Sequence, residues 1–379
     1  MTKPIYLDYA AATPLDPEVL LAMTPYFTEQ FYNPSATYIA ARSTRQAVEQ
    51  ARAAVAGWLG ARPAEIIFTS GATEANNLAI LGVAAKHPEG EILVSAIEHE
   101  SVIAPAQKAD AKLIPVSTGG IVDIDHLAKN INEKTLLISV MLVNNELGSV
   151  QPLREIAKLV EQTRKSRQRA GNKLPIYLHT DAAQAGNFFD LHVSRLGVDL
   201  MSINGGKIYG PKQSGALYVR AGVQLEPLIL GGGQEFNIRS GTENVAGIIG
   251  LVRALDIAQK NREEESQRIT GLRHSMENEI AEIYSAAVIN GSKKHRAPHI
   301  LSVSFPGRDN ERLMMELDER GIQAAVGSAC SADSVEPSHV LSAIGLDGPE
   351  ARATLRFSLG RQTKQKDITT AVQLLASIL

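Results

Sequence analysis

One lysine of the chain follows an apolar run and lies beside two glycines. Residues 200–203 are Leu-Met-Ser-Ile, and Asn204-Gly205-Gly206-Lys207 come next. Burial disfavours an ammonium, and a neutral amine can attack a carbonyl carbon, which is how a lysine forms a Schiff base. On this stretch alone, a solvent-exposed loop lysine is the better interpretation. The rest of the chain must decide between the two.

Other polar groups follow further apolar runs at the same relative place. They are Gly71-Ala72-Thr73, Glu98-His99, Asn144-Asn145-Glu146, Asp181-Ala182-Ala183-Gln184, and Asn204 with Lys207. Each has an ordinary explanation, since threonines such as Thr73 often cap helices and lone histidines such as His99 are often satisfied, partly buried side chains. The carboxyl ends of parallel strands meet at one edge of a sheet, however, and ligands bind there. The set therefore predicts a single ligand site.

These groups match the requirements of pyridoxal phosphate. Lys207 can form the Schiff base, a carboxylate such as Asp181 can keep the pyridine nitrogen protonated, and the glycine turn before Thr73 can hold a phosphate at a helix N-terminus. The chain lacks Gly-x-Gly-x-x-Gly after its first sheet strand and lacks Gly-x4-Gly-Lys-Ser/Thr. Pyridoxal phosphate is therefore favoured over a dinucleotide or a nucleoside triphosphate.

The elements that position these groups alternate along the chain. Short apolar strands separated by helices predict an α/β fold, with a mostly parallel seven-stranded sheet covered by helices on both faces. The strands are expected at residues 65–69, 92–95, 113–116, 136–143, 176–179, 199–203 and 215–219, with helices at 40–59 and 71–86.

A smaller α+β region is expected at the C-terminal end. A long helical stretch from Val245 to Ile283 leads into a strand at 299–305, a helix at 311–320, a strand at 355–359 and a last helix at 367–379. We assign residues 15–254 to a large cofactor-binding domain. Residues 1–14 and 255–379 form a small domain, with a mobile loop at about 326–337.

Composition narrows the possible partners and location. The 379 residues carry a net charge of -3, which gives no electrostatic case for nucleic acid or an anionic membrane. The N-terminal residues lack the apolar stretch of a signal peptide and no apolar run is long enough to span a membrane, so a cytoplasmic location is expected. The single cysteine, Cys330, excludes an internal disulfide and a cysteine-based metal site, and we expect no metal.

Seven segments of the chain, in order, resemble the cysteine desulfurases of the class V aminotransferase group, which are fold type I pyridoxal phosphate enzymes. The segments are 6–14 (YLDYAAATP), 68–74 (FTSGATE), 143–148 (VNNELG), 179–184 (HTDAAQ), 207–212 (KIYGPK), 239–242 (RSGT) and 327–330 (GSAC). The resemblance covers nearly the whole chain, and seven motifs in register are far more specific than any one of them.

The resemblance implies a role for each matching residue. Lys207 would bind the cofactor covalently, Asp181 would contact its pyridine nitrogen, His99 would stack on its ring and Gln184 would contact its phenolic oxygen. The remaining cofactor contacts would come from Ala72, Thr73, Asn145 and Asn204, with Thr242 reaching over from the second subunit of a homodimer. Asn33, Asn145 and Arg356 would bind the carboxylate of the substrate, L-cysteine.

Cys330 would be the nucleophile. Its neighbours, Gly327-Ser328-Ala329 and Ser331-Ala332, are small and favour an exposed thiol, although a structural free cysteine is about equally common in an unknown chain. The resemblance implies that Lys207, His99 and Cys330 are catalytic, that Cys330 receives the sulfur as a persulfide, and that L-alanine is released. The sulfur would pass to an acceptor protein, for tRNA thiolation or iron–sulfur assembly.

Two positions depart from the family pattern, and two other functions remain open. The family usually has Ser-x-His-Lys where this chain has Asn204-Gly205-Gly206-Lys207. We therefore expect weaker or rearranged phosphate contacts, with the amide of Asn204 as a substitute and the Gly206 backbone N–H facing the phosphate. The alternatives are a selenocysteine lyase or aminotransferase on the same scaffold, or a non-catalytic sulfur-relay or regulatory protein.

Overall fold

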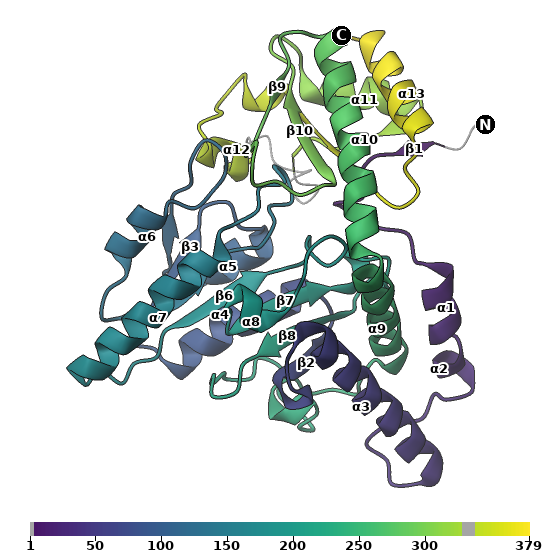
Figure 1. The fold of residues 1–379 in the computed structure, drawn as a ribbon. Helices are drawn as coiled ribbons and strands as arrows, with labels where there is room; N and C mark the ends of the chain where they lie inside the picture. Colours follow the sequence, from purple (N-terminus) through teal and green to yellow (C-terminus); the bar gives the residue numbers. More distant parts are fainter. Residues whose placement is uncertain (1–3, 328–337) are drawn as a thin grey trace.

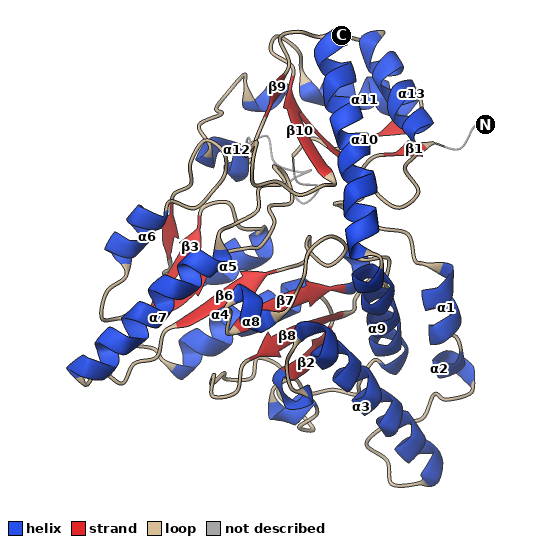
Figure 2. Ribbon diagram, viewed as in Figure 1, coloured by secondary structure: helices blue, strands red, loops and turns tan. Residues whose placement is uncertain are grey.

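The computed structural model describes residues 4–327 and 338–379. A seven-stranded sheet with its helices forms the larger part, and a three-stranded sheet with further helices forms the smaller part (Figures 1 and 2). Helix α10 (Arg262–Ile283) runs between the two parts, and the first described strand of the chain, β1 (Ile5–Tyr6), lies in the smaller one.

The large sheet confirms the predicted fold class. Its strands lie in the order β2 (Ile66–Thr69), β8 (Gly215–Val219), β7 (Leu200–Asn204), β6 (Tyr177–Asp181), β5 (Thr135–Ser139), β3 (Glu91–Ser95) and β4 (Lys112–Ile114). Strand β8 is antiparallel to both of its neighbours, and the other adjacent pairs are parallel. The carboxyl ends of β2, β3, β5, β6 and β7 therefore point to the same edge.

Both faces of this sheet are buried, because successive strand residues point to opposite sides. In β2, Ile66 and Phe68 join one apolar cluster and Ile67 joins the other. Helices α4 (Ala72–Lys86) and α5 (Glu100–Lys108) cover the face of Ile67. The opposite face is covered by α1 (Pro17–Met23), α3 (Ile39–Leu59), α6 (Ile124–Asn130), α7 (Leu153–Ala170), α8 (Val193–Leu196) and α9 (Val245–Lys260), with α2 (Pro25–Thr28) beside them.

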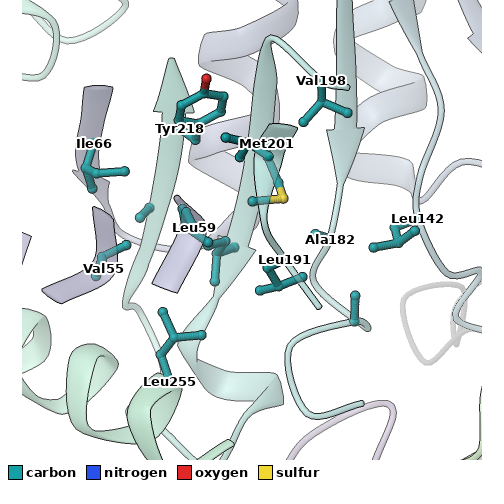
Figure 3. Close-up of a cluster of buried hydrophobic side chains, with 14 of the residues drawn as sticks. Val55, Leu59, Ile66, Leu142, Ala182, Leu191, Val198, Met201, Tyr218 and Leu255 are labelled. Atoms are coloured by element: carbon teal, nitrogen blue, oxygen red, sulfur yellow. The ribbon is translucent and has the colours of Figure 1, made fainter. Parts of the chain in front are cut away.

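Figure 3 shows part of the second face. Val55 and Leu59 of α3 lie near Ile66 of β2, and Leu255 of α9 lies below Met201 of β7. All five side chains are at most a few per cent exposed. At about 25 cal/mol per Å² of buried apolar surface, a fully buried side chain of this kind contributes about 1.5–3 kcal/mol. This packing fixes the strands whose ends carry the polar groups.

The smaller part has its own apolar cluster. An antiparallel sheet in the order β12 (Thr354–Ser358), β10 (Ile300–Ser304) and β9 (Val288–Ile289) packs with α10, α11 (Asn310–Glu319) and α13 (Gln365–Ala376). Strand β1 pairs with β11 (Ile322–Gln323), and α12 (His339–Ala343) packs on a separate cluster. The domain boundaries at residues 14 and 254 stay a prediction.

Some predicted elements end elsewhere. The apolar run 136–143 leaves the sheet after Ser139, although residues 140–143 stay buried. Strand β4 ends at Ile114, before Pro115, which has no N–H for the ladder. The long helical stretch is broken at Asn261 into α9 and α10. Strands β1, β9 and β11 are too short to have shown a pattern in the sequence.

The junction of β2 and α4 depends on glycine. Gly71 has φ 138° and ψ 178°, a conformation that is open almost only to glycine, and its carbonyl accepts the first helical bond from Ala75. A Cβ at Gly215 of β8 would lie 2.6 Å from the Gly71 Cα. These two glycines allow the N-terminus of α4 to lie directly beside the strand ends.

Candidate active site

A cavity at the carboxyl edge of the large sheet brings nine predicted residues together. It is lined by Ala72, Thr73, His99, Asn145, Asp181, Gln184, Asn204, Lys207 and Arg356, together with Ala10, Ala11, Ser101, Met141, Val143 and Ala183. The residues come from the ends of five strands, from the N-terminal segment and from β12 of the smaller part. The cavity therefore lies where the two parts of the molecule meet.

Lys207 ends a short 3₁₀ turn, η2 (Gly205–Lys207), that directly follows β7. Its Nζ donates a hydrogen bond to the carbonyl oxygen of Ala11. The turn is capped by Asn204, whose Oδ1 accepts from the Gly206 N–H at 3.1 Å. The Gly206 amide is thus already used within the turn, so the expectation that it faces a phosphate is wrong. The Nδ2 of Asn204 remains as the donor that this residue can offer.

Asp181 is the last residue of β6, lines the cavity and is 5% exposed. Its Oδ1 accepts from the Ala183 N–H at 2.8 Å, and its Oδ2 accepts from Nδ2 of Asn76, also at 2.8 Å. These two donors fix the plane of the carboxylate. Asp181 is therefore built to face a cationic group in the cavity, such as a protonated pyridine nitrogen.

His99 caps helix α5 at the end of the β3 loop. Its Nδ1 accepts from the Ser101 N–H at 3.1 Å and lies 2.9 Å from the Ser101 Oγ. Burial lowers the pKa of the imidazole, the positive charge of Lys207 lowers it further, and the Asp181 carboxylate opposes both effects. His99 is consequently neutral at neutral pH, which suits a ring that stacks on a ligand.

Gln184 is held by two polar contacts. Its Nε2 donates to the carbonyl oxygen of Ala10 at 2.9 Å, and its Oε1 lies 3.3 Å from Nε2 of His299. Burial lowers the pKa of His299 to about 3, so this imidazole is neutral and its N–H can donate to Gln184. The second hydrogen on Nε2 of Gln184 can then be donated to a ligand in the cavity, and a phenolate oxygen needs such a donor.

Arg356 supplies a buried positive charge from the smaller part. It is 3% exposed, its Nη2 donates to Asp8 Oδ1 at 2.7 Å, and its Nη1 donates to the carbonyl oxygen of Asn145 at 3.0 Å. Within the described residues, Nε of Arg356 and Oδ1 of Asn145 are buried and have no hydrogen-bond partner. Unused donors and acceptors of this kind suit the carboxylate and amino groups of an amino acid.

The donor set fits pyridoxal phosphate as a whole. Ala72 and Thr73 are the first two residues of α4, and their N–H groups have no partner within the helix, so they suit a phosphate. Asp181, Gln184 and Lys207 present a carboxylate, an amide and an amine to the same cavity. Together these are the groups that the pyridine nitrogen, the phenolic oxygen and the aldehyde of the cofactor require.

Three predicted residues are not placed at this cavity. Asn33 is exposed, and its Oδ1 accepts from the Ser35 N–H at 2.9 Å. Thr242 lines a different cavity with Ser70 and Arg239, so its predicted role depends on a second subunit. Cys330 lies outside the described residues. The roles of these three residues stay predictions.

Asn76, Ser101, Asp8 and His299 contact site residues but were missed in the sequence. Asn76 lies four residues after Ala72, so helical spacing places both on the same side of α4, and this pattern could have identified Asn76. The contacts of Asp8 and His299 join segments that are far apart in the chain, and no local pattern reports such contacts. Across residues 4–327 and 338–379, no group of histidine, cysteine and acidic side chains could hold a metal ion, and no helix could cross a membrane.

Known proteins that are similar to this chain indicate the same kind of enzyme as the geometry of the site. The family model of aminotransferase class-V matches residues 5–370. The cysteine desulfurase IscS of Dictyoglomus turgidum is 42% identical, with 100% of this chain and 95% of the relative covered. The cysteine desulfurase IscS 1 of Archaeoglobus fulgidus is 39% identical, with 99% of this chain and 96% of the relative covered.

Solved structures show the same relationship. A structure described as a NifS-like protein superposes with a TM-score of 0.90 at 31% identity and covers 99% of both chains. A structure described as SspA in complex with cysteine has a TM-score of 0.79 at 36% identity, over 93% of this chain and 98% of that one. The chain therefore belongs to the aminotransferase class-V family and, within it, to the cysteine desulfurases.

Proposed function

We propose that this protein is a pyridoxal-phosphate-dependent cysteine desulfurase, which removes sulfur from L-cysteine and releases L-alanine. One observation carries the proposal: Lys207, Asp181 and Arg356 line the same cavity, although they come from the η2 turn after β7, from β6 and from β12. An amine, a buried carboxylate and a buried guanidinium at these positions suit a covalently bound pyridoxal cofactor and an amino acid substrate. A non-catalytic relay protein would have no use for this combination.

Each residue has a part in binding or in proton transfer. Ala72, Thr73 and Asn204 would hold the phosphate, Gln184 the phenolic oxygen and His99 the ring face. Arg356 would bind the substrate carboxylate together with Asn145, through donors and acceptors that the protein itself leaves unused.

The bound cofactor supplies an electron sink next to the Cα of the substrate. Asp181 would keep the pyridine nitrogen of the cofactor protonated, and this would raise the capacity of the ring to accept electrons. The Nζ of Lys207 would be the base that takes the Cα proton. The Sγ of Cys330 would then attack the substrate sulfur and carry it as a persulfide.

Several finer parts of the proposal go with this activity. The protein would act as a homodimer in which Thr242 contacts the phosphate of the partner's cofactor, and Asn33 would assist in binding the substrate. The persulfide would pass to an acceptor protein for tRNA thiolation or iron–sulfur assembly. A cytoplasmic location stays a prediction.

Incubation of the purified protein with pyridoxal phosphate, L-cysteine and a reductant tests the function. The expected products are alanine and sulfide in equal amounts, with Cys330 heavier by one sulfur atom before reductant is added. A keto acid product would identify an aminotransferase instead. Release of selenide from selenocysteine, with no sulfide from cysteine, would identify a selenocysteine lyase. Absence of any cofactor band would favour the non-catalytic alternative.

Replacing Gly206 by histidine is expected to tighten cofactor binding. A Cβ at this position would meet no atom closer than 3.6 Å, and the backbone conformation does not require glycine, so a side chain fits. A histidine there would add a donor near the phosphate. One hydrogen bond to a charged group contributes about 1.5–3 kcal/mol, which corresponds to a decrease of at least about tenfold in the dissociation constant for pyridoxal phosphate.

The matched control is Gly206→Ala, which fills the same space without a donor. We expect this variant to bind pyridoxal phosphate as the wild type does, measured by titration of the apoprotein. If Gly206→His and Gly206→Ala give the same dissociation constant, the missing histidine has no consequence for the phosphate.

A further inference from the structure

Asn76 connects two groups of the active site that lie on different elements. It is fully buried on α4, and its single amide nitrogen is 2.8 Å from Asp181 Oδ2 and 2.9 Å from Ser101 Oγ. The hydroxyl of Ser101 is in turn 2.9 Å from His99 Nδ1. A continuous chain of hydrogen bonds therefore runs from Asp181 to His99 through Asn76 and Ser101.

The direction of every bond in this chain is fixed. An ionised carboxylate only accepts, so the nitrogen of the Asn76 amide must face Asp181, and its other N–H then points to the Ser101 oxygen. Because that oxygen accepts from Asn76, the hydroxyl hydrogen is available for the Nδ1 of His99. The backbone N–H of Ser101 also donates to this Nδ1, at 3.1 Å. Two donors converge on Nδ1, so the ring proton of His99 lies on Nε2.

Packing alone does not account for an asparagine at position 76. Among the described residues, the Oδ1 of Asn76 is buried and has no hydrogen-bond partner. Leaving an acceptor in this state costs about 1–3 kcal/mol, whereas an apolar side chain such as leucine would fill a similar volume without that cost. The two hydrogen bonds that Nδ2 donates, to Asp181 and to Ser101, are what the asparagine provides and leucine would not.

We propose that Asn76 is a positioning residue that holds the Asp181 carboxylate and directs the Ser101 hydroxyl onto His99 Nδ1, which keeps His99 as the neutral Nε2–H tautomer. Protonation of His99 would place a hydrogen on Nδ1 and break both bonds donated to it. The network thus connects the carboxylate of Asp181 to the tautomer of His99. This inference rests on the proposed function for its meaning, but the network itself can be measured without turnover.

The test is ¹⁵N NMR of the histidine-labelled full chain, with and without bound pyridoxal phosphate, using a His99→Gln variant to assign the signal. The wild type should show a neutral His99 with an acceptor-type Nδ1. In Asn76→Leu, the Asn76 amide no longer orients the Ser101 hydroxyl toward His99. The neutral form of His99 therefore loses the stabilisation of about one hydrogen bond. The pKa of His99 should then rise by about one unit, which is a tenfold change in its protonation equilibrium.

Three further variants serve as controls. Asn77→Leu makes the same change at the next residue of α4, whose side chain donates to the Thr73 carbonyl, and it should leave His99 unchanged. Ser101→Ala should raise the pKa of His99 as Asn76→Leu does, and Ser101→Thr, which keeps the hydroxyl, should restore it. If Asn76→Leu fails to fold, the comparison of Ser101→Ala with Ser101→Thr decides the matter.

The kinetic prediction is a fall of about tenfold in kcat for Asn76→Leu with little change in KM for L-cysteine, because Asn76 is not among the residues that line the cavity. If the wild type desulfurates cysteine but the variants give the same His99 signals as the wild type, this inference is wrong and the proposed function still stands. A wild type that binds no pyridoxal phosphate would overturn the function instead. The His99 signals of the apoprotein would still test the network in that case.

Discussion

Replacement of Lys207 by alanine is expected to abolish desulfuration and to leave pyridoxal phosphate bound without a covalent link. The variant loses both the amine that joins the cofactor and the base that takes the Cα proton. A positioned base alone supplies about 10²–10⁴-fold, so alanine formation should fall by at least about 10²-fold, and by more because the amine that joins the cofactor is lost as well. The absorbance band of the linked cofactor should disappear, and borohydride should no longer fix the cofactor to the chain.

The loss should be chemical and not structural. Lys207 donates a hydrogen bond to the carbonyl of Ala11, and the loss of one such bond costs about 1 kcal/mol of stability, so the variant should still fold. Lys212→Ala is the matched control, since Lys212 lies five residues further along and is exposed. It should retain full activity and the cofactor band. If Lys207→Ala retained covalent cofactor, another lysine would have to be the attachment site.

The sequence predicted Lys207 because the fold class and the site share one physical cause. Apolar runs long enough for buried strands, each followed by a polar group, define both the parallel sheet and the edge at which ligands bind. Thr73, His99, Asn145 and Asp181 were found by the same argument. Strand β8 was predicted as a strand from its composition. Its antiparallel direction depends on how the segment between β7 and β8 connects them, and this could not be predicted.

Other features depend on contacts that no local pattern encodes. The Asp8 carboxylate bonds to Arg356 across most of the chain, and the carbonyl of Ala11 accepts from Lys207 because β1 pairs with β11 and brings the N-terminal segment to the cavity. The bond from Gly206 to Asn204 arises from a 3₁₀ turn, which glycines permit but do not require. Such details decide which donors remain for a ligand.

Replacement of Cys330 by serine should stop sulfide production and persulfide formation while leaving the cofactor attached to Lys207. The thiolate is the nucleophile in such transfers, and a serine hydroxyl is not ionised at neutral pH. Addition of L-cysteine should still change the cofactor spectrum, because Lys207, Asp181 and Arg356 are intact. Sulfide released under reductant should fall to the background of free cysteine with pyridoxal phosphate.

The single cysteine of the chain allows a chemical control for this variant. Alkylation of the wild type can modify only Cys330 among thiols, and it should reproduce the loss seen in Cys330→Ser without affecting cofactor binding.

The electrons of the desulfuration balance at Cys330. The C–S bond of the substrate breaks, its electron pair stays with the carbon skeleton that becomes alanine, and an S–S bond forms at Cys330. The reductant then supplies two electrons to release sulfide. Full activity of Cys330→Ser would mean that sulfur leaves the substrate without a protein thiol, and the assignment of Cys330 would fail.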